Sequence, residues 1–432
     1  MSIFVRLGMR FGRRAYVGLA VAVLWLDSLQ AQYVLIPMDA AQTQHLRAYG
    51  LVYGLLMRGV PVDWLLNYRG GSFAFLENGW AAAELERRGI VYQPLSLSEY
   101  GQILTYLSRP EVNMDVVRLE KAPRIAVYAP KSSEPWDDAV QLVLLYAEIP
   151  YDLIYDDEVL SGKLQEYDWL HLHHEDFTGQ YGKFFSFRDR AWYRAMVREQ
   201  TAIAARWGFR RVADLKLAVV KKLREWVQNG GFLFAMCSAT DTYDIALAAE
   251  GIDIVGEIYD GTPLDPLANT RLRYEKCIAF QNFSVRLNEY DYEFSDIDTG
   301  DRRRQAGIRE EQDYFVLREF SAKWDPIPTM LCQNHASRIK GFFGQTTGYD
   351  LHLLKPQVVV MGEFPALGEA RYIHGILGRG FWTFYGGHDP EDYQHFVEEP
   401  PTDVSKYPTS PGYRLILNNV LFPAAKRKKM KT

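Results

Sequence analysis

The stretch GGFLFAMCSATD at positions 230–241 decides the fold of this 432-residue chain. Its glycines end a long helical pattern, Phe232–Met236 is a continuous apolar run, and Cys237 follows at once with small neighbours. An apolar run of this length without alternation is typical of a strand buried on both faces of a parallel sheet. A cysteine at such a strand-to-helix turn lies at a helix N-terminus, where partial positive charge favours a thiolate. The alternative is a buried structural cysteine at the end of a core strand.

Strand and helix patterns alternate on both sides of this stretch, which predicts βαβ units and a mostly parallel sheet. Cys237 would then lie at the carboxyl edge of a sheet built from several such units. The expected strands are 125–128, 151–155, 169–172, 357–361 and 380–385, and the expected helices are 136–148, 189–206, 213–229 and 411–421.

The rest of the chain predicts further segments. Residues 33–92 alternate on a smaller scale, with a helix capped by Asp39, and a polar linker is expected at 109–123. Residues 257–350 break the rhythm and are rich in Asp, Arg and aromatic residues, which indicates an insertion or cap, partly β. The expected organisation is a signal peptide at 1–31, an N-terminal α/β unit at 32–120, a main α/β domain at 121–256 and 351–425, the insertion at 257–350 and a basic tail at 426–432.

Residues 1–31 have the pattern of a secretory signal peptide. Four arginines precede the apolar run 15–26, which is too short to span a membrane, and small residues follow at Ala31. We therefore expect an exported protein, periplasmic or extracellular, with no transmembrane segment after cleavage. Its three cysteines are an odd number, so at least one thiol stays unpaired within the chain.

The composition narrows the class of partner. A hydrophobic fraction of 48% excludes a disordered chain, and a net charge of −5 gives no support to nucleic-acid binding. The aromatic fraction of 14% suits a thick core, and it also suits a sugar-like or extended ligand. We expect a small-molecule, glycan or peptide ligand.

The loop GGHDPE at 386–391 follows the expected strand 380–385. Carboxyl ends of parallel strands share one edge, so His388 and Cys237 could meet there. Histidine can act as the base for a thiol, with Asp389 or Glu391 to orient it.

The run HLHHED at 171–176 ends another expected strand and supplies a third polar group. His173, His174, Glu175 and Asp176, together with Asp389, are expected to bind substrate. A metal site made by His173, Glu175 or Asp176 with His388 is the lesser alternative. We expect no cofactor. The glycine-rich run 341–348 lacks the Gly-Lys-Ser/Thr of a phosphate loop and is given no role.

The order of strand, Cys237 and helix, followed much later by strand and Gly-Gly-His, resembles the class I glutamine amidotransferase-like superfamily. The stretch from Gly378 to Glu391 looks especially like its trehalose-utilisation (ThuA-like) branch. The resemblance covers 121–256 and 355–424. It implies a flavodoxin-like α/β fold with Cys237 as nucleophile, His388 as base and Glu391 after it.

Several runs, among them 64–73, 173–181 and 418–423, look like an exported bacterial family commonly labelled asparagine synthetase B. Such a glutamine-hydrolysing synthetase would need a cysteine at the mature N-terminus, where signal removal would expose Gln32. It would also need a Ser-Gly-Gly-x-Asp-Ser loop, and Gly70-Gly71-Ser72 is not one. These residues argue against the literal label.

The leading hypothesis is an exported amidotransferase-like hydrolase that acts on an amide or glycan-related substrate through Cys237 and His388. The rival hypothesis is a non-catalytic sugar- or peptide-binding protein that uses the same cleft.

Overall fold

The computed structural model describes residues 33–132 and 134–426 as a mixed α/β fold. The expected signal peptide and all of the basic tail except Lys426 lie outside these residues. No helix in the described ranges has the length and apolar character needed to cross a membrane.

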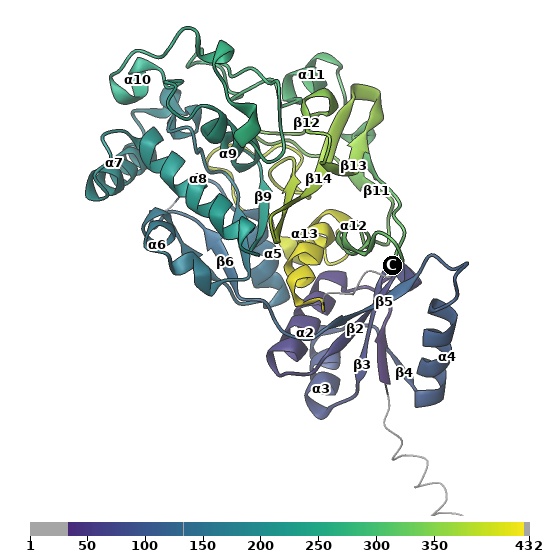
Figure 1. The fold of residues 1–432 in the computed structure, drawn as a ribbon. Coiled ribbons are helices and arrows are strands. Elements are labelled where there is room, and N and C mark those ends of the chain that lie inside the picture. The colour runs from purple at the N-terminus through teal and green to yellow at the C-terminus, as the bar shows by residue number, and fades with distance from the viewer. Residues whose placement is uncertain (1–32, 133, 427–432) are drawn as a thin grey trace, which may run out of the picture.

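The main sheet contains a five-stranded parallel half (Figure 1). Numbered along the chain, these strands lie in the order 2-1-3-4-5, so the winding direction reverses between the first and third of them. In open α/β sheets, ligands bind outside the carboxyl ends of the strands at such a reversal. In spatial order the strands are β7 (Asp152–Ile154), β6 (Ile125–Tyr128), β8 (Trp169–Leu172), β9 (Phe232–Met236) and β15 (Gly380–Tyr385).

The other half of this sheet is antiparallel, because Gly378 and Arg379 close a tight hairpin in which Leu377 pairs with Gly380. Three of its strands come from residues 257–350, the segment expected to be an insertion or cap, partly β, and they extend the main sheet. Residues 277–287 hold no regular strand. Outward from β15 the strands are β14 (Glu369–Leu377), β13 (Val359–Phe364), β10 (Tyr314–Leu317) and β11 (Arg338–Lys340), and β12 (Tyr349–Asp350) also pairs with β14.

Helices cover both faces of the main sheet. Along β9, Phe232, Phe234 and Met236 belong to one hydrophobic core, and Leu233 and Ala235 belong to another. This alternation follows from the two-residue period of a strand. The first core includes α5 (Ala139–Ala147) and α13 (Pro411–Leu421), and the second includes α6 (Asp156–Leu160), α7 (Ala191–Arg206), α8 (Val212–Gln228) and α9 (Ala239–Ala248). The short helices α10 (Glu257–Asp260), α11 (Gly300–Gln305) and α12 (Pro326–Leu331) lie in the 257–350 segment.

The N-terminal unit carries its own five-stranded sheet, in which every neighbouring pair is antiparallel. The expectation of a mostly parallel sheet is wrong here, because only residues 67–71 join β2 to β3, and a parallel crossover needs a dozen or more residues. Strand β5 falls in the stretch expected as a linker. The sheet order is β4 (Gln93–Leu95), β1 (Tyr33–Ile36), β3 (Ser72–Leu76), β2 (Val62–Leu66) and β5 (Asp115–Leu119), with helices α2 (His45–Met57), α3 (Gly79–Arg88) and α4 (Leu97–Leu107).

The two sheets share one hydrophobic core. Helix α2 packs against α5 and α13, and the buried residues form a continuous cluster from β1 to β9. The C-terminal end returns to the N-terminal sheet, where the Lys426 N–H donates to the Arg118 carbonyl at 2.8 Å. Figure 1 shows this arrangement, with the yellow α13 above the purple and blue N-terminal elements. The N-terminal unit is therefore packed against the main domain through a shared core.

Candidate functional site

Four loops meet at the carboxyl edge of the parallel strands. They follow β6, β8, β9 and β15, and they carry the residues 129–132 and 134–138, 173–176, Cys237 and 386–395. Backbone hydrogen bonds tie the loops together: the Cys237 N–H donates to the Gly387 carbonyl at 3.1 Å, and the Ala239 N–H donates to the His173 carbonyl at 3.0 Å. The sheet topology thus brings together side chains that lie up to 251 positions apart, as in the Asp137–His388 pair.

Cys237 stands at a sharp turn between β9 and α9. Its φ of 49° lies in the left-handed region, which costs a non-glycine residue about 1–2 kcal/mol. The side chain is only 4% exposed, and Sγ accepts a hydrogen bond from the Gln345 backbone N–H at 3.3 Å. Strain of this kind persists only where the surroundings enforce it, and it concentrates at functional sites.

His388 connects the thiol to a carboxylate. Its Nε2 lies 3.0 Å from Asp137 Oδ1, and its imidazole also hydrogen-bonds the Cys237 side chain. Burial disfavours the charged ring, but the hydrogen bonds with Asp137 and Cys237 outweigh burial and raise the pKa of His388 to about 10. At neutral pH the His388 ring is therefore protonated, with a carboxylate and a thiol as its hydrogen-bond partners.

Asp137 is the site residue that the sequence analysis missed. Residues 136–148 were expected to be helical throughout, whereas α5 begins at Ala139 and leaves Asp137 in the loop. Burial raises the pKa of Asp137, but contact with His388 and the Thr402 N–H leaves it below the usual value. The available signal was the position of Asp137 and Asp138, two adjacent carboxylates between an expected strand end and an apolar helix.

Glu391 and Asp389 do not contact the His388 ring that one of them was expected to orient. The Glu391 carboxylate hydrogen-bonds Ser410, and both carboxylate oxygens of Asp389 accept from the Tyr413 hydroxyl at 2.8 Å. The two residues therefore fasten the His388 loop to the start of α13. The carboxylate that bonds the His388 ring is Asp137.

His173 and His174 lie beside His388, with ring centroids 4.8 Å and 5.1 Å from its ring. His173 Nδ1 lies 3.1 Å from Asp138 Oδ1, the same oxygen that caps α5 by accepting from the Val140 N–H. Burial lowers the pKa of His173 to about 4, against the opposing charge of Asp138. At neutral pH this ring is uncharged.

Glu175 and Asp176 bond other groups. Glu175 lies 4.0 Å from the ammonium of the fully buried Lys216, and burial is the main cause that raises the pKa of Glu175 to about 8. Asp176 accepts from the Thr178, Gln180 and Gly182 N–H groups, so its carboxylate organises its own loop. Of the residues expected at the site, the structure gathers Cys237, His388, His173 and His174 around one point.

The glycine-rich run 341–348 packs directly on the site, although the sequence analysis gave it no role. The His388 N–H donates to the Phe343 carbonyl at 2.9 Å, and the Gln345 N–H donates to Cys237 Sγ at 3.3 Å. A Cβ on Gly344 would lie 2.8 Å from the His388 nitrogen, so only glycine permits this approach. This run supplies backbone donors rather than a phosphate cradle.

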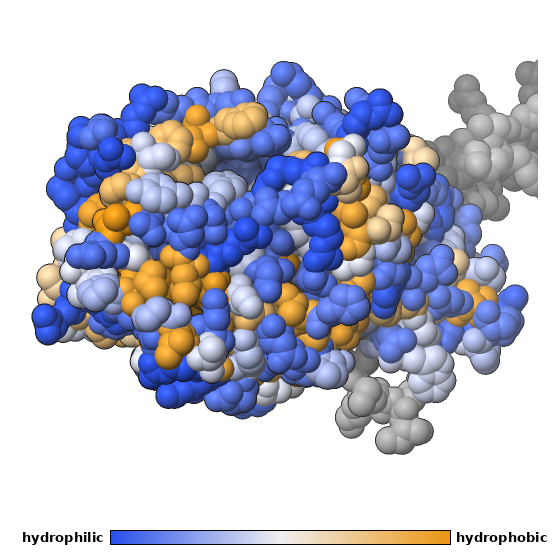
Figure 2. Space-filling model, turned by 90° about the horizontal axis from the view of Figure 1, so that it is seen from above, coloured by the Kyte–Doolittle hydropathy of each residue, from blue (hydrophilic) through white to orange (hydrophobic). Residues whose placement is uncertain are grey.

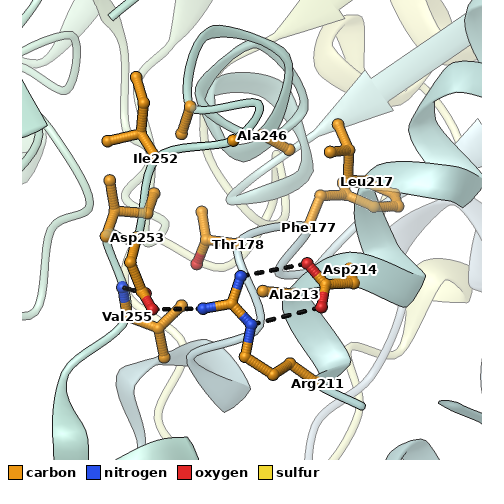
Figure 3. Close-up of a pocket in the computed structure, with 13 residues that line it drawn as sticks. Phe177, Thr178, Arg211, Ala213, Asp214, Leu217, Ala246, Ile252, Asp253 and Val255 are labelled. Carbon is orange, nitrogen blue, oxygen red and sulfur yellow. Dashed lines mark hydrogen bonds and ion pairs between the residues drawn. The ribbon is translucent and has the colours of Figure 1, made fainter. Parts of the chain in front are cut away.

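Two surface hollows lie elsewhere on the molecule. The one in Figure 3 is crossed by Arg211, which pairs with Asp214 and Asp253 and so has no unpaired charge to offer. A larger groove between the N-terminal unit and β10 contains Asn67 and Gln333, whose amides bond each other. Neither includes a residue of the carboxyl edge. Seen from above, the surface is mainly polar, with separate apolar patches (Figure 2).

Comparison with known proteins gives no named relative, since no family profile and no curated protein matches the chain. Among solved structures it is similar to two cytoplasmic proteins of Salmonella typhimurium, STM3548 and STM1381, each with 11% identity, a TM-score of 0.32 and full coverage of that chain, over 71% and 70% of this one. A GH42 beta-galactosidase has a TM-score of 0.28 and 11% identity, and covers 62% of this chain and 28% of its own. Likenesses this weak assign neither an activity nor a family.

Proposed function

We propose that this protein is a thiol-dependent hydrolase of amide bonds, built on a flavodoxin-like, amidotransferase-like parallel sheet. The observation that carries the proposal is the chain of contacts from Cys237 through His388 to Asp137, with Cys237 at a positive φ. The 2-1-3-4-5 strand order supports the flavodoxin-like assignment. The contacts lie at the carboxyl edge of those strands, which is where such sheets bind their ligands.

The chemistry would proceed in two halves. The Cys237 thiolate attacks the amide carbonyl carbon, the C–N bond breaks, and the departing amine takes the proton of His388, which leaves a thioester on Cys237. His388 then accepts a proton from water, which attacks the thioester carbon and releases the acid and the thiolate. Asp137 keeps the imidazole oriented and stabilises its charged form.

The test uses a Cys277→Ser/Cys332→Ser background, in which Cys237 is the one remaining thiol. Mass spectrometry follows iodoacetamide labelling at neutral pH, and amine release is measured over a panel of small primary and secondary amides. We expect rapid labelling that His388→Ala slows at least about tenfold, because the imidazolium no longer favours the thiolate. Labelling no faster than that of an ordinary thiol, with or without His388, would overturn the proposal.

Ligand binding without catalysis is the second candidate, and one observation favours it. The ring centroid of Trp136 lies 5.7 Å from that of His174. Trp136 also contacts Phe184 and Trp192, and the three rings form an aromatic cluster beside the site. Aromatic rings of this kind suit contact with sugar or peptide surfaces. An inert Cys237 in a folded chain that still binds a glycan or peptide would select this function.

A further inference from the structure

Three imidazoles at the carboxyl edge form a cluster that thiol chemistry does not require. His173, His174 and His388 each offer a ring nitrogen, and these three nitrogens lie within 4.8 Å of one another. His173 and His174 come from the loop after β8, and His388 comes from the loop after β15. A thiol hydrolase needs one of the three rings.

The unpaired nitrogen of His173 points to a missing ligand. Its Nδ1 bonds the Asp138 carboxylate, so in the neutral ring the hydrogen sits on Nδ1 and Nε2 carries a lone pair. The residue is 1% exposed, and this Nε2 has no hydrogen-bond partner among residues 33–132 and 134–426. A buried polar atom left unpaired destabilises the folded chain, and a bound ion would remove this cost.

Carboxylates stand behind two of the three rings. Asp138 accepts from His173, and Asp137 lies 3.0 Å from His388 Nε2. In metal sites a carboxylate commonly holds the second nitrogen of a ligating histidine, which fixes the orientation of the ring and makes it a stronger donor. The arrangement therefore resembles the surroundings of metal ligands as well as those of a catalytic base.

We propose that His173, His174 and His388 bind a divalent late transition-metal ion of the Zn²⁺ class. Neutral imidazoles suit zinc, copper and nickel, whereas magnesium and calcium prefer oxygen ligands. Three histidines leave a fourth tetrahedral position open for water or substrate. The nitrogens belong to two loops that the sheet already holds in place, so little rearrangement is needed.

A consequence follows that rests on the proposed hydrolase function. His388 cannot ligate the ion through the nitrogen that shares a proton with Cys237 and still protonate the leaving amine. The metal-loaded chain is therefore the inactive form, and the metal acts as an inhibitor of the thiol chemistry.

The test titrates ZnCl₂ into chelator-treated protein in the Cys277→Ser/Cys332→Ser background, by calorimetry. We expect one ion per chain, and binding at least tenfold weaker in His173→Gln and in His174→Gln. His352→Gln, which changes an exposed histidine outside the cluster, serves as the matched control and should bind like the parent. Circular dichroism establishes that each variant is folded. If His173→Gln does not fold, His174→Gln, at a partly exposed position, carries the test.

Labelling of Cys237 with iodoacetamide separates the two proposals. Saturating Zn²⁺ should slow labelling at least tenfold in the parent and have little effect in His173→Gln. Absence of zinc binding, or equal binding by the parent and both cluster variants, overturns the metal site even if labelling is rapid. Slow labelling of the metal-free parent with intact zinc binding overturns the hydrolase and leaves the metal site standing. Zinc binding that leaves labelling unchanged overturns the inhibition.

Discussion

Two of the stacked histidine pairs among the described residues each contain a ring whose pKa is shifted, and the two shifts have opposite directions. His388 and His395 stack with ring centroids 4.8 Å apart beside Asp137, and the pKa of His388 rises to about 10. His45 and His335 stack 4.1 Å apart beside Arg414, where burial first and the guanidinium second lower the pKa of His335 to about 4. The same side chain is thus a cation at the carboxyl edge and neutral between the two sheets.

The clusters around these pairs differ in what their polar groups do. We call Cys237, His388, Asp137, His173 and His174 the edge cluster, and Arg414, Tyr49, Asn418, His335 and His45 the interface cluster. All three guanidinium nitrogens of Arg414 donate, to the Tyr49 hydroxyl, the Met38 carbonyl and the Gly70 carbonyl, and so fasten α13 to the N-terminal unit. The edge cluster instead keeps a cysteine at a positive φ beside a protonated imidazole. The comparison predicts that changes in the edge cluster impair chemistry and that changes in the interface cluster impair stability.

The largest expected effect is that of Cys237→Ser. On an amide that the parent hydrolyses, turnover should fall at least about 1,000-fold, because the hydroxyl is a poor nucleophile without a thiolate. The thermal midpoint should change little, since serine fits the same space. Cys277→Ser is the matched control: burial raises the pKa of the Cys277 thiol, so it contributes no nucleophile. Retained turnover in Cys237→Ser would exclude thiol catalysis.

Arg414→Met should cost about 3 kcal/mol of unfolding free energy, because the Gly70 carbonyl and the Tyr49 hydroxyl lose the guanidinium donors and the Met38 carbonyl keeps only His45. Chemical denaturation measures the loss, and labelling of Cys237 below the transition should keep its rate. Arg210→Met, at an exposed arginine, should stay within about 0.5 kcal/mol of the parent. A marked loss of Cys237 reactivity in folded Arg414→Met would show that the two clusters are coupled.

Asp137→Asn should slow hydrolysis and Cys237 labelling by roughly 100-fold, because an amide holds the ring but does not stabilise its positive charge. Asparagine can still accept from the Thr402 N–H, so the loop should keep its conformation. Asp392→Asn is the control, since Asp392 bonds His395 and not His388, and its effect should stay below about threefold. Equal rates in Asp137→Asn and the parent would remove Asp137 from the mechanism.

The smallest effect concerns Asp241, a buried carboxyl under the glycine-rich run that accepts from Thr346 at 2.8 Å. Burial raises its pKa to about 7 from an ordinary value of 3.8, so the folded chain binds more protons than the unfolded chain between these pH values. Stability should therefore fall as pH rises from about 4 to 7. Asp241→Asn should weaken this fall by about 1 kcal/mol or more, measured by denaturation at pH 5 and pH 8.

The exposed Asp189 supplies the control for this pH dependence. Asp189→Asn should leave the difference in stability between pH 5 and pH 8 as it is in the parent. If the free energy of unfolding of Asp241→Asn falls between pH 5 and pH 8 as much as that of the parent, the Asp241 carboxyl is not protonated preferentially in the folded chain.

The sequence determined the parallel strands and their terminal residues. Strands β6, β8, β9 and β15 and helix α13 have the predicted bounds, because an apolar run that is buried on both faces is set by local composition alone. Cys237, His388 and His173 each follow such a strand, so their convergence could be expected from topology before any contact was known.

Tertiary structure decided the direction of pairing and the partners of the charged groups. In the N-terminal sheet a short turn makes β2 and β3 antiparallel, and the strands that are joined through helices pair antiparallel as well. The glycine-rich run, which follows β11, reaches Cys237, and no periodicity indicates this contact. Asp137 rather than Glu391 meets His388, since a carboxylate bonds whichever donor the folded loops place within about 3 Å, irrespective of sequence distance. Sequence fixes which residues end the strands, whereas long-range packing selects which of them touch.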